Sequence, residues 1–314
     1  MELQDFQNLL LGFMSQDQNQ MASSIIQNLI ETQYPLYIDY LIQSIQQDQN
    51  ERVFNVSITF LHVEVVKKRI FANNELAFQI VQKLTPIIAG ILQSPIVQDN
   101  FKKIVATILA QLHIFVFHLD NNIEIAKYIL TTFNEMPEIR KYLIHCLFEI
   151  SVNDQEFGGF NIDDLISIIT HNAQDLTLYM PIVNLFFAIA MRRPDTPVLQ
   201  ELFTQLFASC PEENLDEMLH SLSEFAEHSS SFFLPCLPTL TQQLCNFAAN
   251  VKLPEVIRNK AMMCLSSISE GAPEMCQSTQ EYFIPVFQTL IQIASEITDD
   301  SPLEYEPNNT EPYQ

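Results

Sequence analysis

Hydrophobic residues recur at helical spacing along nearly the whole chain, and clusters of Pro, Asn, Asp and Gln interrupt them at intervals of roughly 12 to 20 residues. This pattern predicts short amphipathic helices joined by turns. The turns within each predicted pair are short, so neighbouring helices must pack antiparallel. We therefore expect an all-α protein built from about seven to eight helix pairs.

The positions of the polar clusters predict the bounds of the individual helix pairs. Their predicted ranges are 3–13 with 19–30, 36–46 with 51–71, 75–92 with 97–119, 123–133 with 137–152, a fifth pair opened by Asn161 as a cap with its second helix at 175–191, 196–208 with 213–227, and a seventh pair within 232–270. Ser278 and Glu281 have the spacing of a capping box for one further helix that ends near Ile297. Residues 299–314 are acidic and lack periodicity, which predicts a disordered tail after a solenoid domain over 1–298.

Three arginines mark a repeat. Arg52, Arg140 and Arg258 each fall in the first turn of a predicted second helix, with apolar residues following on one face. They are 88 and 118 residues apart, close to two and three units of about forty residues. HEAT and armadillo repeats have this period, so we predict a right-handed α-solenoid of HEAT-type helix pairs. Solenoids of this kind usually bind other proteins.

The composition narrows the function. Only 5 Gly are present in 314 residues, which argues against loops that cradle nucleotide phosphates, and we expect no cofactor. Lys and Arg total 15 against 38 Asp and Glu, and the formal charge of −23 would repel nucleic acid. The same field would attract basic proteins or basic peptide signals. The alternative is that the acidity only keeps an apolar chain soluble.

The six cysteines include no C-x-x-C pair, and four lie in apolar helical stretches. We expect small buried side chains of a reduced intracellular protein. The N-terminus lacks a signal-peptide pattern, and no apolar run approaches the roughly 18 residues that span a bilayer. The sequence therefore predicts a protein of the cytosol or nucleus without membrane insertion.

The histidines offer no catalytic or metal site. His113 and His118 diverge by about 140° around a helix, and His220 and His228 lie two turns apart, too far to share a zinc ion. Glu224 has the i, i+4 spacing of a surface pair with His228. We therefore expect neither a bound metal nor an enzyme.

Two further features resemble reactive sites. His145 precedes Cys146, but adjacent helical residues point about 100° apart, which favours a core position for Cys146. The run FGGF at 157–160 lacks the Lys, the Ser or Thr and the preceding strand of a phosphate loop. We expect it to be a mobile connection between the fourth and fifth pairs.

Basic residues cluster at two predicted helix ends. Lys67, Lys68 and Arg69 end the second helix of the second pair, and Arg192 with Arg193 ends that of the fifth. Cations at helix C-termini complement the helix dipole. The alternative is a contact with an acidic partner. Charge reversal would separate the two, because a capping role changes the melting temperature and a contact role changes binding.

The 23 phenylalanines also allow two interpretations. Pairs such as Phe203 and Phe207 are typical of the core between stacked helices. Grooves between adjacent first helices could instead accept an aromatic side chain from an extended peptide.

Both ends of the chain resemble importin-beta repeats. The opening LQDFQNLLLGFMSQDQNQMASSIIQNLIETQYPLYIDYLIQSI is similar to the first importin-beta repeat and the start of the second. Later segments are similar in order and spacing to the beta-three (importin-five) branch of the family, namely NLDEMLHSLSEFAEHSSSFFLPCLPTLTQQLCNFA, VIRNKAMMCLSSISEGAPEM and YFIPVFQTLIQIASEITDD. The resemblance extends over nearly the whole chain.

The resemblance implies a nuclear transport receptor, or an N-terminal fragment of one, that carries protein into the nucleus. Family members bind the GTP form of the GTPase Ran through inner helices of the first repeats, Phe-Gly nucleoporins through outer grooves, and basic cargo through an acidic inner surface. The implied protein is a monomer of cytoplasm and nucleus, including the nuclear pore. By position on the predicted helices, the expected Ran contacts are Glu64, Lys67 and Lys68, and the expected nucleoporin contacts are Phe203, Leu206, Phe207, Leu240 and Leu244.

The alternative function is a HEAT-repeat scaffold that assembles other complexes and has no transport role. A scaffold complete in itself needs polar capping repeats at both ends. The last predicted helix, YFIPVFQTLIQIASEI, is apolar on more than one face. This favours a segment of a longer solenoid.

Overall fold

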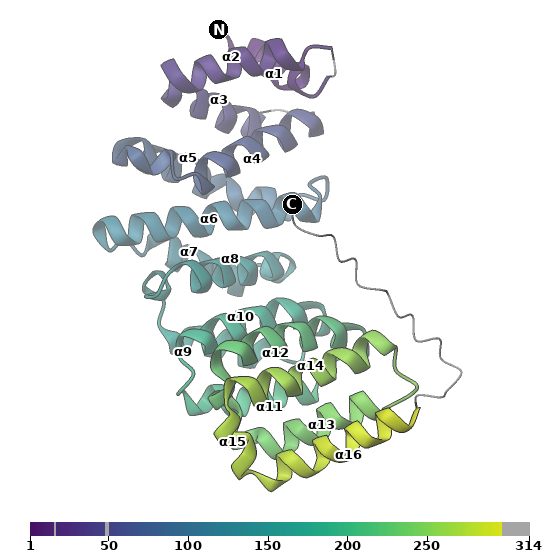
Figure 1. Cartoon of the computed structure of the whole chain (residues 1–314). Coiled ribbons are helices and arrows are strands. Elements are labelled where there is room, and N and C mark those ends of the chain that lie inside the picture. The colour runs from purple at the N-terminus through teal and green to yellow at the C-terminus, as the bar shows by residue number, and fades with distance from the viewer. Residues whose placement is uncertain (16, 48–49, 297–314) are drawn as a thin grey trace, which may run out of the picture. The chain divides into compact units, whose positions relative to one another are not determined.

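A computed structural model describes residues 1–15, 17–47 and 50–296, and the expected tail at 299–314 lies outside these residues. All regular elements within the described residues are helices (Figure 1). This confirms the predicted all-α solenoid of helix pairs. The chain divides into two compact units, Met1–Arg192 and Arg193–Gln314, and the division falls between the fifth and sixth pairs of the domain that we predicted over 1–298.

Unit 1 contains five helix pairs. Its helices are α1 (Leu3–Phe13), α2 (Asn19–Thr32), α3 (Tyr34–Gln47), α4 (Glu51–Val66), α5 (Asn74–Gln93), α6 (Asp99–Asp120), α7 (Glu124–Glu135), α8 (Arg140–Asn153), α9 (Ile162–Asn172) and α10 (Tyr179–Arg192). The second helix predicted over 51–71 is too long, because Lys68 has a left-handed φ of 56° and a 3₁₀ turn follows at Ile70–Ala72. Asn161 caps α9 as predicted, since its side chain accepts the Asp163 N–H at 3.1 Å.

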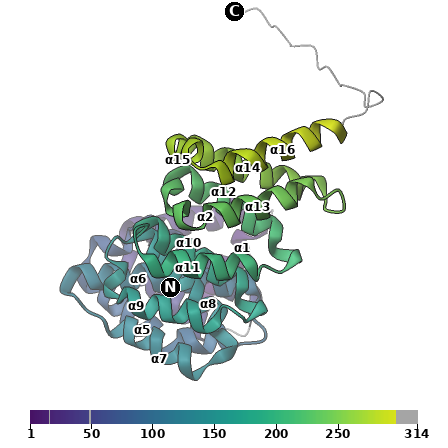
Figure 2. The ribbon, with the colours of Figure 1, turned by 90° about the horizontal axis from the view of Figure 1, so that it is seen from below.

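The described part of unit 2 contains two pairs, a short helix and a final long helix. Its helices are α11 (Pro197–Ala208), α12 (Leu215–Ser229), α13 (Leu237–Ala249), α14 (Glu255–Gly271), α15 (Pro273–Ser278) and α16 (Gln280–Glu296). The short helix α15 lies at the corner that joins α14 to α16 (Figures 1 and 2). The predicted capping box of Ser278 and Glu281 is wrong, because Ser278 ends α15 and its hydroxyl donates to the Met275 carbonyl at 3.0 Å.

Short 3₁₀ turns precede several helices. They lie at Pro137–Ile139 before α8, Leu176–Leu178 before α10, Glu212–Asn214 before α12 and Ser230–Cys236 before α13. Our predicted helix starts at 137, 175, 213 and 232 fall on or beside these turns. The apolar pattern therefore located each chain reversal but could not separate its first 3₁₀ turn from the α-helix that follows.

The arginine repeat has a structural cause in two of its three copies. The Arg140 Nε donates to the carbonyl of Phe133 at 2.9 Å, near the C-terminus of α7. The Arg258 Nε donates in the same way to Ala248 at 2.8 Å, near the C-terminus of α13. Each cation thereby satisfies a carbonyl at the negative end of the preceding helix dipole. This contact fixes the second helix of the pair against the first.

Second helices also contact one another, and we call each such contact a seam. In unit 1, α4, α6, α8 and α10 contact each other in turn, and in unit 2 α12 contacts α14. Several hydrogen bonds between neighbouring pairs join residues that are 36 to 47 positions apart in the sequence. The seams thus repeat at the period near forty residues that the arginines predicted.

Helices α5 and α6 are long and apolar enough, by length and composition, to cross a membrane. This differs from our expectation that no apolar run approaches such a length. Core helices of soluble proteins pass the same test. Leu84 of α5 and Leu109 and Leu112 of α6 are at most 3% exposed within unit 1. In this structure, the apolar faces of both helices therefore serve packing between pairs.

Candidate partner-binding surfaces

The end of α4 carries the three residues that we expected to contact Ran. Glu64 is not available there, since it is only 3% exposed. Its carboxylate accepts a hydrogen bond from the Tyr34 hydroxyl at 3.0 Å and forms an ion pair with Arg69 at 3.4 Å. Burial, with the Glu64 charge second, raises the pKa of Tyr34 well above its usual range. Glu64 therefore joins the two helices of the second pair, α3 and α4.

Lys67 and Lys68 are exposed and directly follow α4. Lys67 is the C-terminal cap residue of α4, and the Lys68 N–H donates to the Val65 carbonyl at 2.9 Å. Their positions suit both interpretations that the sequence left open. They complement the dipole of α4, and they are accessible to an acidic partner. Arg192 behaves differently, because its Nη2 donates to the Val152 carbonyl at the C-terminus of α8 at 2.6 Å.

The five expected nucleoporin contacts are core residues of unit 2. Phe203, Leu206 and Phe207 on α11 and Leu240 and Leu244 on α13 are all at most 5% exposed. The ring of Phe203 lies 5.3 Å from that of Phe233 and 6.0 Å from that of Phe232, both edge-on. These positions do not line an open groove, and the core interpretation of the phenylalanines holds for them. A partner could contact these side chains only if the core opened.

An open apolar groove lies in unit 1 instead. It has a volume of about 740 Å³ and runs between the turn of the second pair and the end of the third pair's first helix. Its apolar lining comes from Phe54 of α4, Ile87 and Ile91 of α5, and Ile96 in the following loop, which is 75% exposed. Exposed aliphatic side chains around a concave surface are typical of sites that bind a side chain of a partner.

One of the residues that line the groove is a glycine. Gly90 lies within α5 and lines the groove, and a Cβ placed on it would meet no atom within 4 Å. Glycine in a helix costs about 0.5–1 kcal/mol relative to alanine, and no steric need explains it at this position. At the rim, the Gln98 amide donates to the Glu51 carboxylate at 3.0 Å. The groove therefore combines an aliphatic floor with amide and carboxylate groups at its edge.

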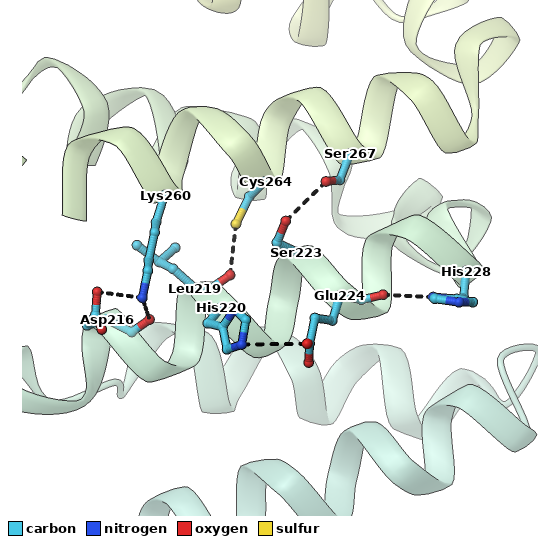
Figure 3. A network of polar contacts seen from close by, with 9 residues as sticks. All are labelled: Asp216, Leu219, His220, Ser223, Glu224, His228, Lys260, Cys264 and Ser267. Carbon is cyan, nitrogen blue, oxygen red and sulfur yellow. Dashed lines mark hydrogen bonds and ion pairs between the residues drawn. The ribbon is translucent and has the colours of Figure 1, made fainter. Parts of the chain in front are cut away.

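Polar contacts join α12 and α14 at several points along their seam in unit 2 (Figure 3). Lys260 pairs with Asp216 at 2.8 Å, the Cys264 thiol donates to the Leu219 carbonyl at 3.1 Å, and the hydroxyls of Ser223 and Ser267 are 3.0 Å apart. Burial raises the pKa of Cys264 to about 12. The thiol is therefore a structural donor and not a nucleophile.

We predicted a surface pair between Glu224 and His228, but the carboxylate of Glu224 pairs with His220 instead. The Glu224 carboxylate lies 3.5 Å from the His220 Nε2, one turn earlier on α12. His228 instead donates from Nδ1 to the backbone carbonyl of Glu224 at 3.0 Å (Figure 3). All three residues lie on the surface of α12, where such pairs contribute only tenths of a kcal/mol.

The FGGF loop is buried and hydrogen-bonded to its surroundings, so our prediction of a mobile connection is wrong. Phe157 and Phe160 are 3% and 7% exposed. The Gly158 carbonyl accepts the Nε2–H of buried His113 at 2.8 Å, and the Gly158 N–H donates to the Asp154 carboxylate at 2.5 Å. A second donor, His118, reaches Asp154 at 2.8 Å. His113 and His118 diverge around α6 as predicted. Both nevertheless contact residues 154–158, His113 through the Gly158 carbonyl and His118 through the Asp154 carboxylate.

Burial and hydrogen bonding set the protonation states of His113 and Asp154 at this loop. Burial lowers the pKa of His113, and its Nδ1 has no hydrogen-bond partner among the described residues. Burial acts to raise the pKa of Asp154, but the hydrogen bonds from Gly158 and His118 outweigh it and hold that pKa below its usual range. His113 is thus kept neutral and Asp154 is kept charged.

Cys146 is fully buried in α8, as predicted, and burial raises the pKa of its thiol well above the usual range. Its neighbour His145 points elsewhere, to the Thr107 hydroxyl at 3.3 Å and the Glu149 carboxylate at 3.7 Å. Across the part of the chain that the structure describes, no three His, Cys, Asp or Glu side chains form a cluster that could hold a metal ion.

The comparisons with known proteins concern the fold. No protein-family model and no curated protein matches the sequence. Solved structures do match: Kap121p has a TM-score of 0.76 at 18% identity, over 97% of this chain and 30% of that chain. The chain has a karyopherin fold. Kap121p bound to Nup53p, and the karyopherin Kap121p bound to the extreme C-terminus of the protein phosphatase Cdc14p, both give a TM-score of 0.74 at 18% and 17% identity, over 93% of this chain and 29% of that chain.

These likenesses set limits as well. At 17–18% identity they establish the helix-pair architecture and not the partners. The chain spans less than a third of the length of Kap121p. The beta-three branch that the sequence suggested stays a prediction.

Proposed function

We propose that the chain is a nuclear transport receptor of the importin-beta type, or a segment of one, that binds Ran-GTP, Phe-Gly nucleoporins and basic cargo. The likeness to Kap121p over nearly the whole chain carries this proposal. The net charge of −23 supports basic cargo, because a negative field attracts basic signals and speeds their encounter. The proposed protein is a monomer, is not an enzyme, and moves between cytoplasm and nucleus through the nuclear pore.

Ran binding is the decisive test. Full-length chain immobilised on beads is offered Ran loaded with GTP or with GDP, and the transport proposal expects retention of the GTP form only. Equal retention of both forms, or retention of neither, contradicts it. The scaffold alternative would then be the better account.

The Ran contact is assigned to Lys67 and Lys68, since Glu64 is buried. Reversing both charges, Lys67→Glu with Lys68→Glu, is expected to weaken the affinity for Ran-GTP about tenfold or more. The matched control is Lys127→Glu with Lys252→Glu, which changes the net charge equally at two other exposed positions. If the first pair lowers the melting temperature and leaves binding unchanged, the lysines serve only the dipole of α4.

The nucleoporin contact is assigned to the apolar groove around Gly90, because the positions first expected are in the core. Gly90→Leu would place a bulky side chain in the groove, because a Cβ at this position meets no atom within 4 Å. We expect it to reduce binding of a Phe-Gly repeat peptide at least tenfold, measured by fluorescence anisotropy, while Gly90→Ala has a smaller effect. Unchanged binding in Gly90→Leu would remove the groove from the proposal and leave the Ran test unaffected.

A further inference from the structure

The apolar groove around Gly90 carries a single charge. Among the described residues that line it, Glu51 of α4 is the only one with an ionisable side chain, and Glu51 is exposed. Aliphatic side chains such as Ile87 and Ile91 form the floor. A carboxylate beside an otherwise uncharged concave surface attracts a cation on a bound ligand and repels an anion. The groove can therefore distinguish apolar ligands by the charge of their flanking groups.

The Glu51 carboxylate has capacity to accept such a cation. Glu51, Phe54 and Asn55 have the i, i+3 and i+4 spacing of neighbours on one helix face, and all three line the groove. The Gln98 amide donates to one oxygen of the carboxylate at 3.0 Å. A carboxylate has about four acceptor positions. Within the described residues no other side chain bonds to this one, so a cation can bind it without displacing Gln98.

The cations closest in sequence to the lining are turned away or engaged. Arg52 follows Glu51 directly, but successive residues on a helix point about 100° apart, and Arg52 is not part of the lining. Lys83 lies on α5 one turn before Ile87, and its ammonium forms an ion pair with Asp39 of α3. Neither cation neutralises the groove.

The two lysines near the start of α6 interact with α8. The Lys102 ammonium lies 5.4 Å from the ring centroid of Tyr142, and the charge of Lys103 acts on His145. Neither lysine lines the groove. Within the described residues, Glu51 is therefore the charge that a ligand in the groove meets.

The groove has room for a short extended segment of a partner. Its volume of about 740 Å³ is in the range of sites that hold ligands larger than one side chain. Gly90 has no side chain, so a ligand backbone can approach α5 closely there. The side chains of Asn55 and Ser94 line the groove and make no hydrogen bond to another described residue, so they can pair with backbone groups of the segment. The residues that flank a bound aromatic side chain then extend to the rim.

We propose that Glu51 makes the groove select Phe-Gly segments that carry Lys or Arg within two residues of the bound phenylalanine. The phenylalanine packs on the aliphatic floor, and the cation pairs with the carboxylate oxygen that Gln98 leaves open. An acidic residue at the same place is repelled. The inference rests on the proposed nucleoporin site and specifies which of its ligands bind best.

The net charge of the chain has to be separated from this local effect, because a formal charge of −23 favours basic peptides over the whole surface. Glu51→Gln removes the charge and keeps an acceptor for Gln98. Its matched control is Glu75→Gln, since Glu75 is exposed in the first turn of α5 as Glu51 is in the first turn of α4. Glu75 precedes Ile87 by 12 residues, about 18 Å along the helix, which exceeds the Debye length of about 10 Å at 0.1 M salt.

The test measures the binding of three fluorescein-labelled peptides to the full chain by fluorescence anisotropy, in about 0.1 M salt. The peptides share one Phe-Gly core and carry Lys, Gln or Glu two residues after the phenylalanine. We expect the wild-type chain to bind the Lys peptide about tenfold more tightly than the Glu peptide. Glu51→Gln should reduce this ratio at least threefold, and Glu75→Gln should leave it within about 1.5-fold of the wild-type ratio.

The inference is overturned if the wild-type chain binds the Lys and Glu peptides equally, if Glu51→Gln keeps the full ratio, or if Glu75→Gln loses as much of it. The uncharged Gln peptide separates this failure from failure of the nucleoporin site. Binding of the Gln peptide that Gly90→Leu weakens supports the groove whatever the effect of Glu51. If no peptide binds, or if Gly90→Leu leaves all three affinities unchanged, the groove assignment fails and the inference fails with it.

Discussion

The seam between α6 and α8 in unit 1 and the seam between α12 and α14 in unit 2 have the same architecture and different chemistry. In unit 1, His113 is joined to Gly158, 45 residues later, and in unit 2 Leu219 is joined to Cys264, also 45 residues later. The first seam depends on titratable groups and a buried loop. The second uses a thiol, two hydroxyls and one ion pair. The repeat period therefore sets which sequence positions join neighbouring pairs. The chemical groups that make these contacts differ from one seam to the other.

The largest expected effect is local to the first seam. Gly158→Ala places a Cβ 2.6 Å from the His113 Nε2 at a φ of +59°. The left-handed conformation costs about 1–2 kcal/mol and the overpacking about 1–3 kcal/mol, so we expect a loss of about 2–5 kcal/mol. Hydrogen exchange should rise in α6 and α8 and stay unchanged in α12 and α14.

The matched control for this substitution is Gly90→Ala in the same unit. Its Cβ meets no atom within 4 Å, so it should stabilise α5 by about 0.5–1 kcal/mol. If Gly158→Ala is neutral, or if both alanines act in the same direction, the loop does not lock the first seam.

A second prediction tests what the two units share. Arg140→Ala and Arg258→Ala each remove a charged hydrogen bond to a carbonyl near the C-terminus of the preceding helix. We expect each to cost about 1–2 kcal/mol in denaturant unfolding. Arg52 has the same register but an exposed side chain. Arg52→Ala should therefore cost less than about 0.5 kcal/mol, and an equal cost for all three would show that the carbonyl contact is not the cause.

The third prediction uses pH to distinguish the stability of the α6–α8 seam from that of the α12–α14 seam. The pKa of His113 is lowered by burial from its ordinary value of 6.5. The unfolded chain then binds more protons than the folded one, so the stability that depends on neutral His113 is present above pH 6.5 and is lost as pH falls below it. Between pH 7.5 and 5.5 we expect a loss on the order of 1 kcal/mol in unit 1.

The measurement is hydrogen exchange of α6 and α8 against α12 and α14 over this pH range. His113→Gln keeps a donor for the Gly158 carbonyl and removes its titration, so it should reduce the response of the first seam. The remaining response belongs to His145 of α8, because burial lowers its pKa as well. Asp154 adds a second, lower window, because its pKa lies below the ordinary value of 3.8 and its contribution is lost only in stronger acid. Equal acid sensitivity of both seams would contradict the assignment to His113.

The smallest expected effect is in the second seam. Ser223→Ala leaves the Ser267 hydroxyl without its 3.0 Å partner and should cost about 0.5–1 kcal/mol. The double substitution Ser223→Ala with Ser267→Ala removes both groups and should cost less than the sum of the single ones. Thermal unfolding of the four proteins in the cycle measures this coupling.

Much of the fold was predictable from the sequence. The helical periodicity set the number of pairs, and the polar punctuation placed most helix ends within a few residues of the bounds in the structure. The arginine register predicted the repeat period, and the contacts of Arg140 and Arg258 explain why the residue recurs. These features are local, because they depend on residues within one or two turns of each other or on a single helix end.

The candidate surfaces were not predictable in the same way. Phe203 and Phe287 both lie on apolar helices, yet one is 1% and the other 54% exposed, because another segment covers the first and none of the described residues covers the second. The buried Glu64 is hydrogen-bonded to Tyr34, thirty residues earlier, and the FGGF loop is hydrogen-bonded to His113, forty-five residues before Gly158.

The sequence by itself determined the elements and their repeat, because periodicity and helix capping act along the chain. Only the tertiary structure decided which apolar faces are core, which are open, and which charges are already paired. Burial depends on what lies across a face, and in a solenoid that neighbour is about one repeat away in sequence. The open groove at Gly90 and the exposed apolar side chains of α16 both depend on that long-range arrangement.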